Sequence, residues 1–255
     1  YRKRPYDTEE GGVDALHKEW LDRIQPNVKN GSFHEFKRNV AKIVEDFDNI
    51  PLTAEKKPRV AIVGEILVKY SPIANNNIVR VLENEGAEVV CPDIVGFMNY
   101  SLYNQVYKYD HLGGSKKSKV LAELAIKMIR LCEKPMNEAL KNSERFDGIE
   151  AIEQIADGAQ DILSLGNQTG EGWFLTGEMV ESLQNGVNNI VCMQPFGCLP
   201  NHVVGKGVVK ELRSKDPMAN IALVDYDPSL SFVNQLNRIR LMLATARKNM
   251  TENVK

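Results

Sequence analysis

One loop of the sequence, Gln194-Pro195-Phe196-Gly197-Cys198-Leu199-Pro200-Asn201-His202, has residue types and spacing suited to chemistry. It places a single thiol, Cys198, between two prolines and beside a glycine, just ahead of a predicted helix. A thiolate at that place is stabilised by the positive end of the helix dipole, which is typical of reactive or metal-binding cysteines. His202 is a candidate ligand, base or surface cap. We therefore treat Cys198 as the candidate functional cysteine.

The other three cysteines have the pattern of inert structural thiols. Cys91 and Cys192 lie at or within short apolar runs, and Cys132 lies in a helical stretch. Four cysteines in 255 residues are too few for a disulfide-stapled scaffold. The spacing of Cys192 and Cys198 is no recognised metal motif, so a metal centre would need ligands from elsewhere.

A second candidate site is the glycine-rich stretch that runs from Gly166 to Trp173 and opens a predicted helix. Loops of this kind cradle phosphates, which makes Gly170, Glu171 and Gly172 candidate cofactor-binding residues. The stretch is neither a Walker A loop nor a dinucleotide fingerprint. The Glu171 carboxylate would oppose an anion there, so a tight turn is an equal alternative.

Lys69 is the third candidate, in the loop that follows the first predicted strand. Its ammonium group suits a phosphate, although Glu65 in the same loop is an equally good partner. Three asparagines at 75–77 then precede a helix, where capping is the simpler interpretation.

The elements that position these loops are predicted strands and helices that follow one another in β-loop-α order. Continuous apolar runs at 59–64, 88–91, 189–194 and 220–225 predict strands buried on both faces. Helices are predicted between and after them, over 74–86, 97–142 in two pieces, 147–164, 171–184, 203–213 and 231–248. An Asp227-Pro228 turn and a Ser231 cap would begin the last helix. The order predicts an α/β fold with a doubly wound parallel sheet of about four strands, Rossmann-like or flavodoxin-like. In such sheets ligands bind at the carboxyl ends of the strands.

The first residues of the chain have a different pattern of apolar positions. Apolar positions at helical spacing predict helices over 14–25 and 32–49, separated by a turn at 26–32, with Ser32 and Glu35 forming a capping box. A polar, proline-bounded linker follows at 51–58. We therefore divide the chain into a helical segment and linker, 1–57, interpreted as the tail of a preceding domain, and an α/β domain, 58–255.

Composition excludes several classes of protein. The 32 basic and 34 acidic residues leave a net charge of −2, which argues against a nucleic-acid binder acting through bulk charge. No apolar run approaches the roughly 18 residues of a membrane helix. The start, Tyr1-Arg2-Lys3-Arg4-Pro5, has no initiator Met and no apolar targeting core, so we interpret the chain as a fragment.

Several segments together form a recognisable pattern: Val60-Ala61-Ile62-Val63-Gly64-Glu65, Gly86-Ala87-Glu88-Val89-Val90, Gly170-Glu171-Gly172-Trp173, the loop 194–202, Asp225-Tyr226-Asp227-Pro228 and Asn234-Gln235-Leu236-Asn237-Arg238. These segments resemble the carboxyl-terminal part of the acyl-CoA dehydratase activase-related proteins of anaerobic bacteria. In that family, ATP-hydrolysing activase domains precede a region similar to the 2-hydroxyacyl-CoA dehydratase subunits. The similarity covers most of the chain, and the segment 195–202 is specific.

The resemblance implies a cofactor and partners. In the dehydratases, Rossmann-like domains hold a [4Fe–4S] cluster through cysteines of separate domains, one of them after a late strand. Cys198 matches that position, which makes it the expected ligand of an interdomain iron–sulfur site. The family's activator passes an electron to the cluster in an ATP-driven step, before water is eliminated from a 2-hydroxyacyl thioester. The implied setting is the cytoplasm, with activase domains as partner and acyl-CoA as ligand.

The chain also departs from the family. ATP-binding activase motifs and upstream cysteines are absent from these 255 residues, so we expect this fragment alone to hold no intact cluster and to hydrolyse no ATP. Cys91, near another strand end, is a candidate to approach Cys198. Two rival functions stay open: a non-catalytic docking module for the activase, and a CoA- or nucleotide-binding domain that uses the 170–172 loop without metal.

Overall fold

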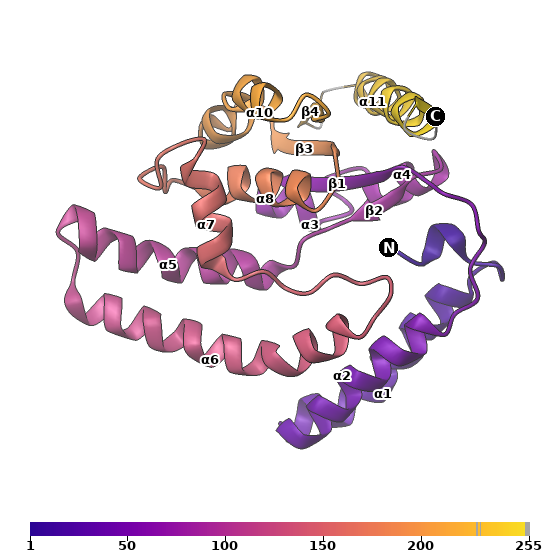
Figure 1. The fold of residues 1–255 in the computed structure, drawn as a ribbon, viewed down its shortest axis with the longest axis horizontal. Helices are drawn as coiled ribbons and strands as arrows, with labels where there is room; N and C mark the ends of the chain where they lie inside the picture. Colours follow the sequence, from indigo (N-terminus) through magenta and orange to yellow (C-terminus); the bar gives the residue numbers. More distant parts are fainter. Residues whose placement is uncertain (228, 230, 253–255) are drawn as a thin grey trace.

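A four-stranded, all-parallel sheet forms the centre of the computed structural model, which describes residues 1–227, 229 and 231–252 (Figure 1). The strand order is β2-β1-β3-β4. The strands are β1 (Arg59–Gly64), β2 (Glu88–Val90), β3 (Asn189–Pro195) and β4 (Asn220–Tyr226). The prediction of an α/β fold with a doubly wound, four-stranded parallel sheet is confirmed.

The order of the strands creates a switch point between β1 and β3. From β1 the chain moves to β2 on one side, then crosses back to place β3 and β4 on the other side. Loops that leave β1 and β3 at their carboxyl ends therefore diverge to opposite faces, the position at which ligands bind in sheets of this class. The 194–202 loop leaves the sheet at this point.

Helices cover both faces because each strand is apolar on both sides. Val60 and Ile62 face α3 (Ile66–Tyr70), α4 (Ile78–Asn84) and α11 (Phe232–Glu252). Ala61 and Val63 point the other way, as the two-residue period of a strand requires, and pack with α8 (Gly172–Gln184) and α10 (Val209–Lys215). Between β3 and α10 lie the short α9 (Leu199–Asn201) and one π-helical turn, η2 (His202–Lys206).

A helical layer is inserted between β2 and β3. The long helices α5 (Ile94–Leu112) and α6 (Lys116–Lys141) pack as a hairpin, with Gly113 in the left-handed conformation at the end of α5. α5 and α7 (Ile152–Gln160) pack with the start of α8 around Trp173, whose indole N–H donates to Asn104 at 2.9 Å. None of the helices in the described ranges has the length and apolarity needed to cross a membrane.

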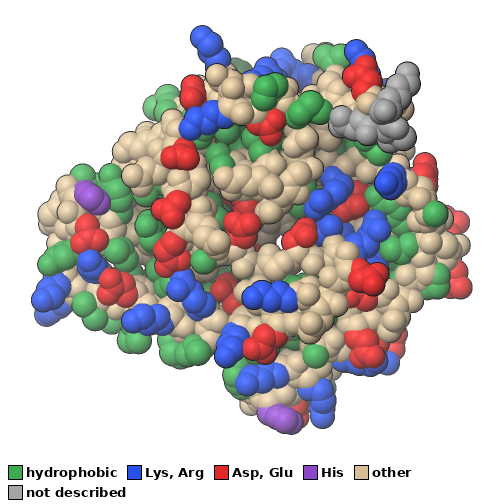
Figure 2. All heavy atoms as spheres, viewed as in Figure 1, with side chains coloured by type: hydrophobic (Ala, Val, Ile, Leu, Met, Phe, Trp, Pro, Cys, Tyr) green, Lys and Arg blue, Asp and Glu red, His purple; other side chains and the backbone are tan. Residues whose placement is uncertain are grey.

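Helix α6 is apolar on two sides. Its inner side buries Ala122 and Ile126, while large apolar side chains on its outer side stay exposed between lysines (Figure 2). The exposed apolar residues are Val120, Leu121, Leu124, Met128 and Leu131. Cys132 is exposed on the same helix, so the prediction that it is a core thiol is wrong.

The amino-terminal segment is attached to the rest of the chain by buried polar contacts. It comprises η1 (Arg4–Tyr6), α1 (Gly12–Asn30) and α2 (Phe33–Asp48). The Tyr6 hydroxyl donates to Glu88 at the start of β2 at 2.8 Å, and Arg4 pairs with Glu83 of α4 at 2.7 Å. Ser32 caps α2 as predicted, accepting from the Glu35 N–H at 3.3 Å, but the predicted capping box is incomplete, because the Ser32 N–H donates to Asn30 Oδ1 and not to Glu35. The division at residue 57 stays a prediction.

Two predicted element boundaries are wrong in the first half of the chain. The expected turn at 26–32 is helical to Asn30, because Pro26 is tolerated within α1 and the true stop is Gly31 in the left-handed conformation. The helix predicted over 74–86 begins only at Ile78, because Asn76 and Asn77 have positive φ.

Other predicted boundaries also differ. The loop expected after β1 contains α3, whose first turn is capped by the Glu65 side chain. The helix predicted over 147–164 spans only Ile152–Gln160, and the one predicted over 203–213 is broken into η2 and α10. The predicted Asp227-Pro228 turn includes Pro228, which lies outside the described residues.

The closest approach of β1 to β3 requires a glycine. Gly64 has φ +145°, and a Cβ there would lie 1.9 Å from the Met193 carbonyl oxygen. We expect Gly64→Ala to lower the free energy of unfolding by about 3 kcal/mol or more, because backbone rather than a flexible side chain occupies the space. Urea denaturation measures this loss.

Gly186→Ala is the matched control, because Gly186 also has positive φ (+71°) but nothing lies within 4 Å of the place that a Cβ would take. It should cost only the about 1–2 kcal/mol of left-handed strain. Equal losses in the two variants would contradict the steric account.

Candidate functional site

The candidate site lies at the switch point, where the loop after β3 meets the start of α3. The Glu65 N–H donates to the Met193 carbonyl at 2.9 Å, which joins the end of β1 to β3 beyond the ladder. The loop then turns at Gly197, with φ +75°, and enters α9 at Cys198. The sequence-predicted Cys198 thus lies in the loop that leaves β3 at its carboxyl end, beside the switch point of the sheet.

Cys198 is half-buried, and apolar side chains surround it in the loop. Phe196 is 67% exposed and Leu199 is 74% exposed. The four cysteines form no disulfide within the described ranges. The site therefore presents a free thiol within an exposed apolar surface.

A chain of hydrogen bonds ties this loop to β4. The Cys198 carbonyl accepts from His202 Nδ1 at 2.7 Å, so Nδ1 carries the proton and Nε2 is the acceptor. Lys206 Nζ lies 3.2 Å from His202 Nε2 and 2.9 Å from the Asp225 carboxylate. Both ring nitrogens of His202 are engaged, so it is a positioning residue of the loop rather than an available base or ligand.

Asp225 is held in its ionised form. Burial alone would raise the pKa of its carboxyl group, but hydrogen bonds from the Gln194 amide and the Lys206 ammonium outweigh burial and lower it. Gln194, fully buried at the end of β3, leaves its Oε1 without a partner among the described residues. The ends of β3 and β4 therefore carry one fixed carboxylate and one buried acceptor without a partner among the described residues.

Glu171 points into the protein and not toward a ligand. Its Oε1 accepts from the Ile66 N–H at 3.1 Å. With its amide nitrogen facing Glu171, Asn201 donates to Oε2 at 2.7 Å while its oxygen accepts from the Glu65 N–H at 3.2 Å. Glu171 and Asn201 thus join the starts of α3 and α8 to the Cys198 loop.

Backbone conformation and packing explain why the two residues that flank Glu171 are glycines. Gly172 has φ +50°, and a Cβ there would lie 2.2 Å from the Asn167 carbonyl oxygen. Gly170 also has positive φ and packs against Pro200 of the Cys198 loop. The first amides of α8 donate to backbone carbonyls, including Trp173 N–H to Asn167 at 2.7 Å. These contacts account for Gly170, Glu171 and Gly172 without a phosphate.

Lys69 forms an ion pair with a carboxylate that the sequence pattern did not reveal. Its Nζ lies 2.5 Å from Glu178 Oε1, and both side chains are almost completely buried. Burial raises the pKa of the Glu178 carboxyl, and the nearby Lys69 opposes that rise. The alternative pairing of Lys69 with Glu65 is wrong, because Glu65 caps α3 by accepting from the Val68 N–H. In the sequence, Glu178 is distinguished only as a charged residue within a nearly continuous apolar helix.

The remaining thiols do not join Cys198. Cys192 is fully buried in the sheet, and burial raises its pKa to about 12. Burial also raises the pKa of Cys91 to about 11, and its thiol contacts the Pro92 carbonyl at 3.5 Å. Cys91 follows β2, two strands and so about 10 Å from β3. Within the described ranges, no three His, Cys, Asp or Glu side chains are grouped to hold a metal ion.

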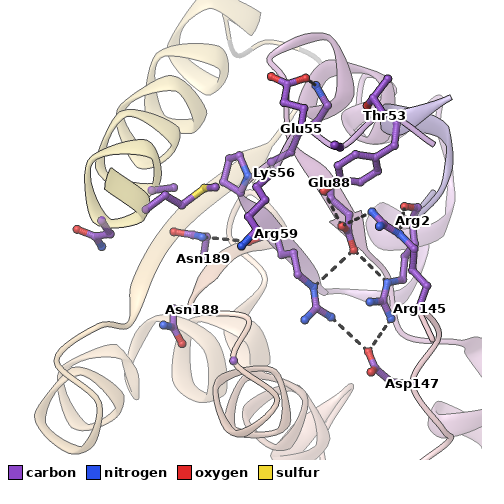
Figure 3. A pocket seen from close by; sticks show the side chains of 18 of the residues that line it. Arg2, Thr53, Glu55, Lys56, Arg59, Glu88, Arg145, Asp147, Asn188 and Asn189 are labelled. Atoms are coloured by element: carbon purple, nitrogen blue, oxygen red, sulfur yellow. Dashed lines mark hydrogen bonds and ion pairs between the residues drawn. The ribbon is translucent and has the colours of Figure 1, made fainter. Parts of the chain in front are cut away.

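A separate hollow of about 740 Å³ lies at the opposite, amino-terminal edge of the sheet. Figure 3 shows the guanidinium groups of Arg2, Arg59 and Arg145 converging on Glu88, which is buried. Arg2 also pairs with Asp147 at 2.6 Å. The charges nearly balance, since the lining carries Arg2, Lys56, Lys57, Arg59, Arg145, Glu55, Glu88, Glu144 and Asp147. We interpret this edge as the ion network that anchors the amino-terminal segment.

The Lys69–Glu178 pair gives a test of how the site is supported. Lys69→Met should lower the free energy of unfolding by about 3–5 kcal/mol at pH 8, because it leaves a buried carboxylate unpaired. The loss should become smaller as the pH falls from 8 to 5, because protonation of Glu178, whose pKa burial raises, removes the unpaired charge. Denaturant unfolding at both pH values measures this difference.

The double variant Lys69→Met/Glu178→Met removes both charges and serves as the control. It should recover most of the stability. A double variant as unstable as Lys69→Met would show that lost packing, not the unpaired charge, causes the effect.

Comparison of the chain with protein-family models, with curated proteins and with solved structures finds no match. A functional proposal therefore has to be based on the geometry of the Cys198 loop at the switch point.

Proposed function

We propose that this chain is the carboxyl-terminal part of an acyl-CoA dehydratase activase-related protein. In this proposal Cys198 contributes one thiolate ligand to an iron–sulfur site that other domains complete. The observation that carries it is the free, half-buried Cys198 thiol in the loop that leaves β3 at the switch point. The parent protein would act in the cytoplasm, with activase domains as its source of ATP-driven electrons and acyl-CoA as its ligand.

The described residues around Cys198 can supply one ligand to a metal site shared between domains, but they cannot form a complete iron–sulfur site. Cys198 is free, whereas both nitrogens of His202 are hydrogen-bonded and Cys91 and Cys192 are buried elsewhere. A cluster held by a single thiol needs further thiolates, because iron–sulfur clusters take about four protein ligands. Those ligands would come from the other domains of the parent. When bound, the cluster would supply one-electron chemistry.

The fixed loop supports a ligand role for Cys198. Two prolines restrict its backbone, and the His202–Lys206–Asp225 chain fixes its orientation from behind. A thiolate held in one position loses little conformational entropy when it binds metal. This chain's part in the chemistry would be to position one ligand and to form one wall.

The apolar surface beside the thiol supports an interdomain location. Phe196, Leu199 and Val203 are each more than half exposed, and large exposed apolar side chains commonly mark contact surfaces. A domain packed on them would exclude water from the metal centre, and burial is one of the factors that set the potential of a cluster.

The rival functions draw on different observations. A docking module for the activase would use the same apolar surface without the metal. A CoA- or nucleotide-binding domain would need Lys69 and the 170–172 loop, whose groups are already occupied within the fold. We therefore favour metal ligation.

Iron and sulfide analysis of the full-length parent protein, prepared without oxygen, tests the assignment. We expect Cys198→Ala to lose most of the bound iron, because one of the cluster's thiolate ligands is gone. Cys132→Ala is the matched control, since Cys132 is an exposed thiol on α6, and it should keep its iron. Circular dichroism checks that both variants fold.

Unchanged iron content in Cys198→Ala would overturn the ligand assignment. A parent protein without iron that still binds its activase domains through Phe196 and Leu199 would instead favour the docking function.

A further inference from the structure

A second pocket, distinct from the Cys198 site, lies beside the edge strand β2. It has a volume of about 400 Å³ and is enclosed by β2, α5, α7 and α8 and by the 146–150 segment. This volume is in the range of small-molecule sites. One of its walls is apolar, formed by Phe174, Ile152 and Ile155. We call it the β2 pocket.

One face of α8 supplies a polar wall. Phe174, Glu178, Glu181, Ser182 and Asn185 all line the β2 pocket. Their spacings of three and four residues place them on one side of a helix. Asp93, which caps α5, faces them from the end of β2. Carboxylates from two elements therefore meet in one cavity.

Asn99 adds an acceptor that nothing satisfies. It is 91% buried (9% exposed), lines the β2 pocket, and its Oδ1 has no hydrogen-bond partner among the described residues. Its Nδ2 faces Glu133 Oε1 at 3.5 Å, which fixes the amide with the oxygen on the other side. A buried carbonyl without a donor is destabilising, so a ligand that supplies the donor binds more tightly.

The donors beside Glu181 are already engaged. The Ser182 hydroxyl donates to the Glu178 backbone carbonyl at 2.7 Å, and the Asn185 amide donates to Glu150 at 3.2 Å. Arg2 and Arg59, at the far end, pair with Asp147 and Glu88, and Arg59 Nε is a buried donor without a hydrogen-bond partner there. At the α8 end of the pocket, the open acceptors are therefore Glu181 and Asn99 Oδ1.

We propose that the β2 pocket binds a small organic cation through an alkylammonium group. Its N–H donors would reach the Glu181 carboxylate and Asn99 Oδ1, and its hydrocarbon part would lie against Phe174, Ile152 and Ile155. An ammonium group matches these acceptors because it carries three donors and one positive charge. The inference does not depend on the iron–sulfur site, since none of these residues takes part in it.

The ionisation of Glu181 makes this binding depend on pH. Burial, followed by the nearby carboxylates of Glu150, Glu178 and Asp93, raises the pKa of Glu181 to about 8, and Lys69 opposes the rise. The other charged or titratable groups that line the pocket are Tyr1, Arg2, Arg59, Cys91 and Asp147. A cation binds the ionised carboxylate, so affinity should rise about tenfold per pH unit up to about pH 8.

Without ligand, the same carboxyl should make stability depend on pH. The pKa of the Glu181 carboxyl is higher in the folded protein than in the unfolded chain, so this group stabilises the folded state fully below about pH 4.5. That stabilisation is lost as the pH rises to about 8. Glu181→Gln should therefore raise the Tm by a few degrees at pH 8 and leave it nearly unchanged at pH 5. Equal effects at both pH values would contradict the half-buried, unpaired state of Glu181.

Titration of the 255-residue chain with n-butylammonium, followed by NMR shifts of Asn99 and Phe174, tests the proposal. At pH 8 we expect saturable binding, about tenfold weaker in Glu181→Gln and several-fold weaker in Asn99→Leu. Glu153→Gln is the control, because Glu153 is an exposed partner of Arg130 outside the pocket, and it should bind within twofold of wild type. n-Butanol, which lacks the charge, should not bind.

Absence of saturable n-butylammonium binding at pH 8 would overturn the proposal, as would equal affinity in wild type and Glu181→Gln. Thermal denaturation shows that each variant is folded during the titration.

Discussion

Strands β1 and β3 approach so closely at their carboxyl ends that a side chain at position 64 would overlap the Met193 carbonyl. This contact lies where the chain diverges to the two faces of the sheet, the switch point at which ligands bind in sheets of this class. The loop of Cys198 begins directly after Met193. The position of the candidate thiol therefore depends on a backbone approach that only glycine allows.

Buried polar groups then hold the loops around this point. Glu171 and Asn201 connect the starts of two helices to the Cys198 loop, and Lys69 of α3 forms a buried pair with Glu178. Such groups are stable inside a protein only when they are partnered, so each specifies one arrangement of its neighbours. The partnered groups around the switch point therefore hold the Cys198 loop in one arrangement. The β2 pocket differs, since acceptors such as Asn99 Oδ1 remain open.

The architecture was predictable from the sequence because both-face-buried strands are continuous apolar runs, such as 59–64. The loop position of Cys198 was predictable because a thiol between prolines after an apolar run indicates a turn; its role as a ligand stays a prediction. The partners of Lys69 and Glu171 were not predictable, because they depend on residues more than 100 positions away or on another loop. The end of α1 was not predictable from Pro26, because the helix tolerates this proline and ends at Gly31. Local pattern therefore indicated the elements, and tertiary contacts decided the chemistry of each side chain.

Metal binding by Cys198 in the parent protein is the central claim. A crystal structure of the anaerobically prepared parent, with anomalous data collected at the iron edge, tests this most directly. We predict an iron atom bonded to Cys198 Sγ, with the remaining ligands from other domains and Phe196 and Leu199 covered. Iron bound elsewhere, with the Cys198 sulfur packed against protein and uncoordinated, would contradict the claim.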